Sequence, residues 1–178
     1  MPSPIAHTAA AYLLYRRLRR TVPAPEERRW PILSTFGTFA FVAFLSLLPD
    51  LDVIPALIHG DMERFHNGIS HSLFFGVLVA PLVGGLVWLV RRQHFKAWTV
   101  TAFLCYELHV VMDYFSIGRG VMLYWPFDPE RRSPPMHLFH GVRWAEGWWA
   151  TEHLWMIANE MAWVALVLLA VHQRPKER

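Results

Sequence analysis

The sequence predicts an all-α integral membrane protein, a helical bundle of four spans with a short N-terminal inserted helix. Composition and length predict this class. Hydrophobic residues make up 54% of the chain and charged residues only 17%, whereas a typical soluble domain has about 25% charged residues. The 178 residues have room for a single domain over residues 1–178. The one cysteine, Cys105, excludes a disulfide framework.

Four apolar stretches are candidates for the membrane spans, namely Ile32–Leu48, Leu73–Val90, Ala97–Met112 and His153–Val171. A helix that crosses a bilayer core needs about 20 residues, so the first and third stretches need help from flanking residues. Leu73–Val90 contains no charged residue, whereas helices of soluble proteins usually have one polar face. We therefore favour membrane spans over buried helices of a soluble protein.

The stretch Ile5–Tyr15 is also apolar, and a basic run that starts at Arg16 follows it. In a signal peptide the basic residues come before the apolar stretch. We therefore expect a short inserted helix here that remains in the mature protein.

The basic residues predict the orientation in the membrane. Twelve of the seventeen Lys and Arg lie in segments 16–29, 91–96 and 174–178, and the positive-inside rule places such segments in the cytoplasm. Segments 49–72 and 113–152 then face the outer side. The net charge of +3 is thus mainly an orientation signal. We expect membrane lipids as partners and no nucleic acid.

All five aspartates and eight of the ten histidines lie on or near this outer side, as expected for a metal site at one membrane face. Asp50 and Asp52 end the first span, and an extended backbone would bring both carboxylates to one point. Gly68 allows a sharp turn between His66 and His71, so that both imidazoles can converge. Histidine is the commonest metal ligand.

His109 and Asp113 are four residues apart in the third span, which places both side chains on one face of a helix. This spacing suits two ligands of one metal ion, or a histidine oriented by a carboxylate. Ionisable residues at such a depth are costly and functional by default. The alternative is a structural hydrogen bond between helices.

Glu160 lies inside the fourth span, where an unpaired carboxylate is costly and needs a cation or a proton-sharing partner. With a rise of about 1.5 Å per residue, Glu160 and His109 reach the same depth in the outer half of the bilayer, and His7 lies slightly lower. Either Glu160 or Glu107 could act as the catalytic base that accepts the proton of a metal-activated water.

Taken in order, these motifs resemble the YdjM-like family of bacterial inner-membrane, metal-dependent hydrolases. The resemblance covers residues 5–130 and is carried by His7, Pro49-Asp50-x-Asp52, His66 to His71, His109-x-x-x-Asp113 and Gly120-x-x-x-Tyr124-Trp125-Pro126-Phe127. It implies a multi-span inner-membrane protein that hydrolyses its substrate with a bound metal. Asn67 stands where many members have an arginine. The loss of that anion clamp leaves the substrate class open.

A weaker similarity is to zinc phospholipase C and P1-type nucleases, which place an early His, an Asp, a His and then His-x-x-x-Asp in the same order. This similarity implies phosphoester hydrolysis. Their later His-x-x-x-Glu pair is not found here, since Ile157 lies four residues after His153.

We therefore expect a divalent metal site that opens toward the periplasmic face of the inner membrane. Its expected ligands are Asp50, Asp52, His66, His109 and Asp113, with His7 and His71 next. Carboxylate and imidazole ligands suit zinc, manganese or iron, and zinc is the first expectation. The expected reaction is hydrolysis of an ester or phosphoester in a lipid or another amphiphile, because the site lies at membrane depth beside the Trp-rich loop 113–152. A metal-ion or proton transporter and a non-catalytic membrane scaffold remain as alternatives.

Overall fold

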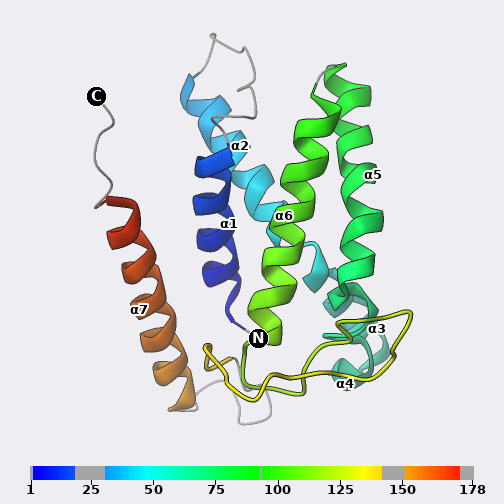
Figure 1. Ribbon diagram of the computed structural model, residues 1–178, viewed down its shortest axis with the longest axis vertical. Helices are drawn as coiled ribbons and strands as arrows, with labels where there is room; N and C mark the ends of the chain where they lie inside the picture. Colours follow the sequence, from blue (N-terminus) through cyan, green and yellow to red (C-terminus); the bar gives the residue numbers. More distant parts are fainter. Residues whose placement is uncertain (1, 19–30, 93, 142–150, 173–178) are drawn as a thin grey trace.

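The computed structural model describes residues 2–18, 31–92, 94–141 and 151–172 (Figure 1). Its α-helices are α1 (Pro4–Leu18), α2 (Pro31–Ser46), α3 (Val53–His59), α4 (Met62–Phe65), α5 (Leu73–Arg91), α6 (Phe95–Tyr114) and α7 (Glu152–His172). Two 3₁₀ turns, η1 (Pro49–Asp52) and η2 (Ile69–His71), lie between them. These described residues form two isolated β-bridges and no strand. The all-α prediction is confirmed.

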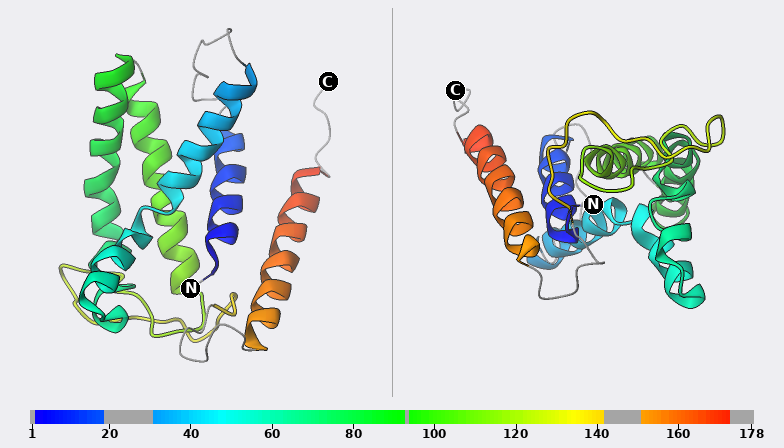
Figure 2. Two further views of the ribbon diagram at one scale, coloured as in Figure 1. Left: turned by 180° about the vertical axis from the view of Figure 1, so that it is seen from behind. Right: turned by 90° about the horizontal axis from the view of Figure 1, so that it is seen from below.

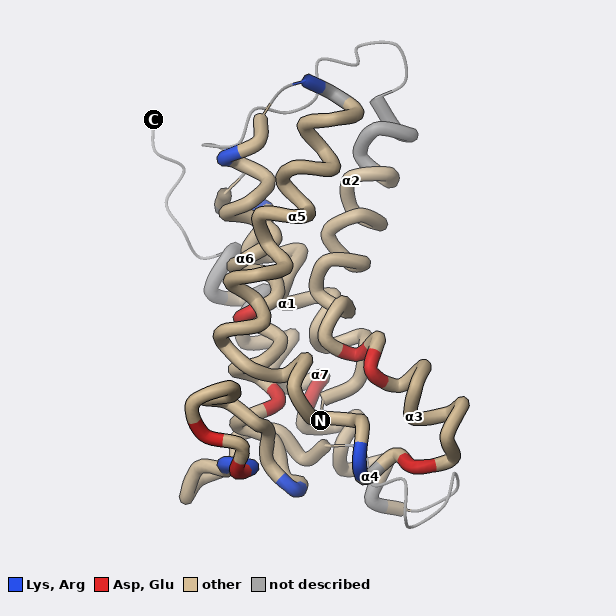
Figure 3. Tube along the Cα trace, turned by 90° about the vertical axis from the view of Figure 1, so that its right-hand side faces the viewer, with Lys and Arg blue, Asp and Glu red and all other residues tan. Residues whose placement is uncertain are grey.

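The bundle is arranged around α6, which contacts α1, α2 and α5. Figure 2 shows α3, α4 and the segment 115–141 gathered at one end of the bundle, beside the N-terminal end of α1. Most of the acidic positions lie at this same end (Figure 3). α7 stands on the far side of α1 from α5 (Figure 1). The fold therefore collects most of the acidic residues where α3, α4 and segment 115–141 meet.

The helical core has two parts. One joins α1, α2, α5 and α6 through apolar side chains that are buried, including Ala11, Tyr15, Val42, Leu45, Ala80, Trp98, Ala102 and Cys105. The other joins the C-terminal half of α6 to the segment after it, through Tyr106, Val110, Val121 and Leu123. The second cluster holds segment 115–141 against the end of α6.

The pairing of α5 with α6 depends on small residues. A Cβ atom at Gly76 would lie 2.0 Å from Glu107 Oε1, and one at Gly84 would lie 1.9 Å from Thr99 Oγ1. Gly76, Ala80 and Gly84 recur every four residues, which lets two helix backbones approach closely in a membrane.

Among the described residues, one helix is long and apolar enough by itself to cross a membrane, over the stretch Leu73–Val90. Phe36–Ser46 and Pro49–His59 qualify only as a pair and are bent by 57°. Pro49 explains the break, because it has no N–H to continue the helix. The predicted stretches Ala97–Met112 and His153–Val171 are helical and lie within α6 and α7. The four-span bundle and its orientation in the membrane stay predictions.

Some predicted features lie outside the described residues. They include most of the basic segment 16–29, the basic tail 174–178 and the tryptophans between 144 and 149. The described part of the outer loop runs from 115 to 141. It is tied to the end of α6 by Leu138 N–H, which donates to Phe115 O at 2.8 Å, and by Ile117 N–H, which donates to Phe139 O at 2.9 Å.

Candidate metal centre

Four polar side chains converge at the acidic end of the bundle. Asp50 comes from η1, His71 from η2, and His109 and Asp113 from the last turns of α6. One potential ligand atom of each lies within 4.8 Å of the others. His71, His109 and Asp113 are buried and Asp50 is half-buried. We call these residues the four-residue group.

The spacing inside the four-residue group matches the ligand shell of one ion. His71 Nε2 lies 3.2 Å from Asp113 Oδ2, 3.3 Å from His109 Nε2 and 3.6 Å from Asp50 Oδ1. His109 Nε2 lies 3.4 Å from Asp50 Oδ1 and 3.8 Å from Asp113 Oδ2. Ligand atoms about 2.1 Å from a tetrahedral zinc ion are about 3.4 Å apart. The observed separations lie on both sides of that value.

The hydrogen bonding of the group also fits a cation. Asp50 Oδ1 and both Asp113 carboxylate oxygens are buried and make no hydrogen bond, and the imidazole nitrogens that face them are Nε2 of His71 and of His109. A buried polar atom without a partner costs free energy. A divalent ion held between these lone pairs would satisfy the carboxylates and two imidazole nitrogens together. The donor set of two imidazoles and two carboxylates suits zinc, manganese or iron.

Asp52 and His66 lie next to this group and do not belong to it. Asp52 contacts the Nδ1 side of His71, and His66 contacts Asp52. Asp52 Oδ2 lies 3.1 Å from His71 Nδ1, and Asp52 Oδ1 lies 2.7 Å from His66 Nδ1. Ser70 Oγ also donates to Asp52 Oδ2 at 2.6 Å, as does the Asn67 N–H at 3.1 Å. A carboxylate on one imidazole nitrogen fixes the tautomer that presents the other nitrogen to a metal.

The local backbone explains why the two aspartates separate. Asp50 and Asp52 lie in the 3₁₀ turn η1, where successive residues are about 120° apart around the axis. The extended backbone assumed for this motif is therefore not the one observed. The imidazole of His71 lies between the two carboxylates, with Asp50 at its Nε2 side and Asp52 at its Nδ1 side.

The carboxylates determine the charge of His71. Burial lowers the pKa of His71, but the facing carboxylates of Asp113, Asp50 and Asp52 outweigh burial and raise it well above its usual value. With no metal bound, these carboxylates therefore favour the protonated form of His71. A metal ion that takes Nε2 must displace that proton.

His7 adjoins the four-residue group without belonging to it. It is buried in α1, and its Nε2 lies 3.1 Å from Asp113 Oδ1. Its ring stacks on that of His109, with ring centroids 3.8 Å apart and planes 18° apart. The carboxylate of Asp113 thus has His7 at one oxygen and His71 at the other.

Residues that sequence reasoning did not single out hold the turn around His71. Tyr106 OH donates to Ser70 O, and Arg131 donates to Asn67 O at 2.6 Å and to His66 O at 3.1 Å. Ser70 had a detectable signal, since it adjoins a predicted ligand. Arg131 had none, because its partners are backbone carbonyls more than 60 residues away in the sequence.

The two glutamates predicted as catalytic bases lie outside the four-residue group. The carboxylate of Glu107 packs at Gly76 of α5, and neither of its oxygens accepts a hydrogen bond. Glu160 is buried in α7 and accepts two hydrogen bonds from Ser3.

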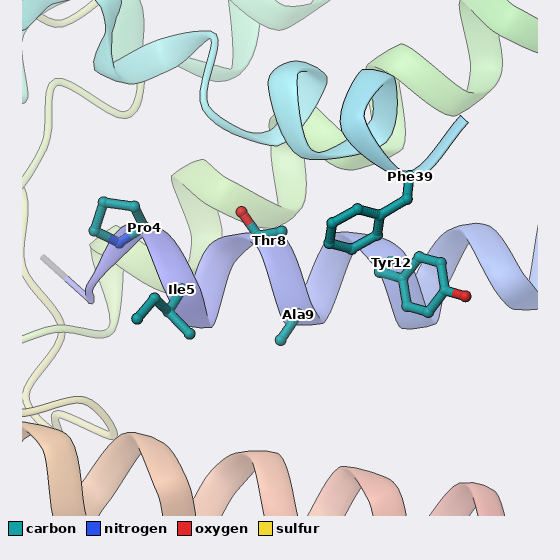
Figure 4. Close-up of a pocket in the computed structure, with 6 residues that line it drawn as sticks. All are labelled: Pro4, Ile5, Thr8, Ala9, Tyr12 and Phe39. Atoms are coloured by element: carbon teal, nitrogen blue, oxygen red, sulfur yellow. The ribbon is translucent and has the colours of Figure 1, made fainter. Parts of the chain in front are cut away.

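An apolar pocket of about 440 Å³ lies on another side of α1 (Figure 4). It is lined by Pro4, Ile5, Thr8, Ala9 and Tyr12 of α1 and by Phe39 of α2. None of its lining residues belongs to the four-residue group, so the pocket is a feature separate from the metal centre.

Comparison with known proteins adds one finding. Residues 1–173 match the family model described as YdjM inner membrane protein. No curated protein and no solved structure matches the chain. The family match covers the four-residue group, His7 and all of α7.

Proposed function

Because the chain belongs to the YdjM inner membrane protein family, we propose that it is a metal-dependent hydrolase of the bacterial inner membrane. The four-residue group is the observation that carries this proposal. It joins two imidazoles and two carboxylates at ligand-shell distances, and it leaves buried carboxylate oxygens without hydrogen bonds. The match to the family supports the inner membrane as the location of the protein.

Each residue of the centre has its own task in this proposal. Asp50, His71, His109 and Asp113 hold the ion, and Asp52 keeps the Nε2 lone pair of His71 turned toward it. A divalent ion bound there supplies Lewis-acid activation of a water molecule. The side chain of Asp50 is 14% exposed, whereas the other three side chains of the group are fully buried. Substrate therefore approaches from the side of Asp50.

The surroundings of Asp50 favour a lipid or another amphiphile as substrate. Asp50 lies in η1, which leads directly into α3, and α3 exposes the apolar side chains of Ile54, Leu57 and Ile58. The N-terminal end of the apolar helix α5 follows His71 by two residues. This apolar surface would place the centre at the boundary of the membrane, where the ester and phosphoester bonds of lipids lie.

The first experiment combines metal analysis with an activity assay. The detergent-purified protein is compared with His71→Ala, which removes a ligand, and with Asp128→Asn, which changes a carboxylate in the outer loop. We expect about one ion per chain in the wild type and in Asp128→Asn, and far less in His71→Ala. Wild-type protein should hydrolyse phospholipid or phosphoester substrates in mixed micelles, lose activity with a chelator and regain it with zinc or manganese.

Three outcomes would contradict the proposal. No bound metal after reconstitution would leave the non-catalytic scaffold as the better account. Stoichiometric metal with metal uptake into proteoliposomes, but no hydrolysis, would favour the transporter. Hydrolysis of a soluble ester at full rate without lipid would refute the amphiphile as substrate and leave the metal-dependent reaction in place.

A further inference from the structure

A buried carboxylate of the last helix binds the first turn of the first helix. Glu160 of α7 is 7% exposed. Its Oε1 accepts the backbone N–H of Ser3 at 2.5 Å, and its Oε2 accepts the Ser3 hydroxyl at 2.5 Å. Both oxygens are therefore engaged by a single residue that is 157 positions away in the sequence.

Ser3 in turn directly precedes α1. Its hydroxyl oxygen accepts the Ala6 N–H at 3.4 Å, in the manner of an N-cap residue. Its carbonyl oxygen accepts the N–H of His7 at 3.3 Å. The start of a helix has unsatisfied N–H groups and a partial positive charge, both of which favour a nearby carboxylate. Glu160 thus caps α1 from a neighbouring helix.

This cap lies one helical turn from the metal centre. His7 bonds directly to Ser3 through its backbone, and its imidazole lies against Asp113 and His109. Glu160 therefore contacts Ser3, Ser3 hydrogen-bonds to the backbone of His7, and His7 contacts the carboxylate of Asp113 in the four-residue group. A shift of the α1 terminus would move His7 away from Asp113 Oδ1.

We propose that Glu160 is a positioning residue, which holds His7 beside Asp113 and His109 by capping α1 through Ser3. This inference rests on the proposed metal centre. It gives Glu160 a different role from that of a catalytic base, because its two oxygens face Ser3 and neither reaches the four-residue group. The docking of α7 has a separate contact, in which Trp163 Nε1 donates to Leu138 O at 3.0 Å.

The test is a titration of the purified full-length protein with Co²⁺, followed by its visible absorption spectrum. Glu160→Ala removes both hydrogen bonds, and we expect about tenfold weaker affinity, as for other residues that orient metal ligands, together with a changed spectrum. Ser3→Ala removes the hydroxyl's bond to Glu160 and the N-cap bond from the Ala6 N–H, and it should change the affinity and the spectrum in the same direction. In Glu160→Gln the amide oxygen accepts the Ser3 N–H and the amide nitrogen donates to the Ser3 hydroxyl. This variant should stay close to the wild type.

Trp163→Phe is the matched control, because it removes a different hydrogen bond of α7, the one to Leu138 O, and leaves the cap in place. It should bind Co²⁺ as the wild type does. Hydrogen exchange of the amides of residues 3 and 5–7 provides a readout without metal, and it should accelerate in Glu160→Ala and Ser3→Ala only.

The outcomes separate this inference from the proposed function. If the wild type binds no Co²⁺, the metal centre and the inference both fail. If the wild type binds Co²⁺ and the folded Glu160→Ala and Ser3→Ala variants match it in affinity and spectrum, only the inference fails. If Glu160→Gln keeps the metal, its spectrum and slow exchange but loses hydrolysis, Glu160 is a catalytic base and not a positioning residue.

Discussion

Asp52 is the position where the cost of a substitution can be worked out contact by contact. Its Oδ2 faces three donors, namely Ser70 Oγ at 2.6 Å, Asn67 N at 3.1 Å and His71 Nδ1 at 3.1 Å. Its Oδ1 faces His66 Nδ1 at 2.7 Å. In Asp52→Asn the amide oxygen can keep the three donors that face Oδ2 and the amide nitrogen takes the place of Oδ1 beside His66, so the main loss is the negative charge. In Asp52→Ala every contact is lost and the ring of His71 is free to turn.

Partners that orient metal-bound histidines typically contribute about 10- to 100-fold to metal affinity. We therefore expect Asp52→Asn to bind zinc about tenfold more weakly, which is ~1.4 kcal/mol. We expect about 100-fold, or ~2.7 kcal/mol, for Asp52→Ala. The order of the two variants follows from the number of contacts that each keeps.

The assay is a competitive titration of zinc against a chromophoric chelator, with circular dichroism to confirm that the helices are retained. His71→Ala is the reference for the loss of a direct ligand. Equal zinc affinity in Asp52→Ala and the wild type would refute the orienting role. A loss as complete as that in His71→Ala would show that Asp52 is itself a ligand, as the sequence analysis expected.

Three further predictions concern pH and packing. Because the pKa of His71 is raised, metal binding releases a proton below that pKa, and the metal affinity should fall by about tenfold per pH unit as the pH decreases. Calorimetry in buffers of different ionisation enthalpy would detect the released proton. A metal affinity that does not depend on pH would contradict His71 as a ligand that loses a proton. Gly76→Ala should destabilise by about 1–3 kcal/mol through overpacking, because a Cβ there would lie 2.9 Å from Cδ1 of the buried Tyr106 ring as well as 2.0 Å from the carboxylate of Glu107. Gly85→Ala, which meets nothing within 4 Å, should not lower the thermal midpoint in detergent. Arg131→Gln should lower the free energy of unfolding by about 1.5–3 kcal/mol, because the charged hydrogen bonds of Arg131 to the backbone carbonyls of His66 and Asn67 disappear. Arg132 is the exposed neighbour, and Arg132→Gln should leave the thermal midpoint unchanged. Equal midpoints for the two variants would argue against a stabilising role for the hydrogen bonds of Arg131.

The helical architecture was predictable from composition and from the lengths of the apolar stretches. Leu73–Val90 is uninterrupted and apolar, and it forms α5. The break after Ser46 was predictable from Pro49, since proline has no N–H to continue the helix. Nothing local indicated the fit of Gly76 against Glu107, because that contact depends on the register between two helices.

The candidate site shows the same division. The i, i+4 spacing of His109 and Asp113 places both side chains on one face of any helix, and the structure has them together in the four-residue group. The motif with Asp50 and Asp52 was ambiguous. An extended chain would bring the two carboxylates together and a 3₁₀ turn separates them, so the local backbone decided their roles.

The sequence by itself determined which helices form and which residue types are available for a metal, because periodicity, proline positions and apolar length act over short range. It also determined the family, since the ordered motifs lie in one chain that matches over residues 1–173. Only the tertiary structure decided that Asp50 lies at Nε2 of His71 and Asp52 at Nδ1, and that Glu160 binds Ser3. These contacts join residues from different helices. Their partners are selected by how the helices pack and not by spacing along the chain.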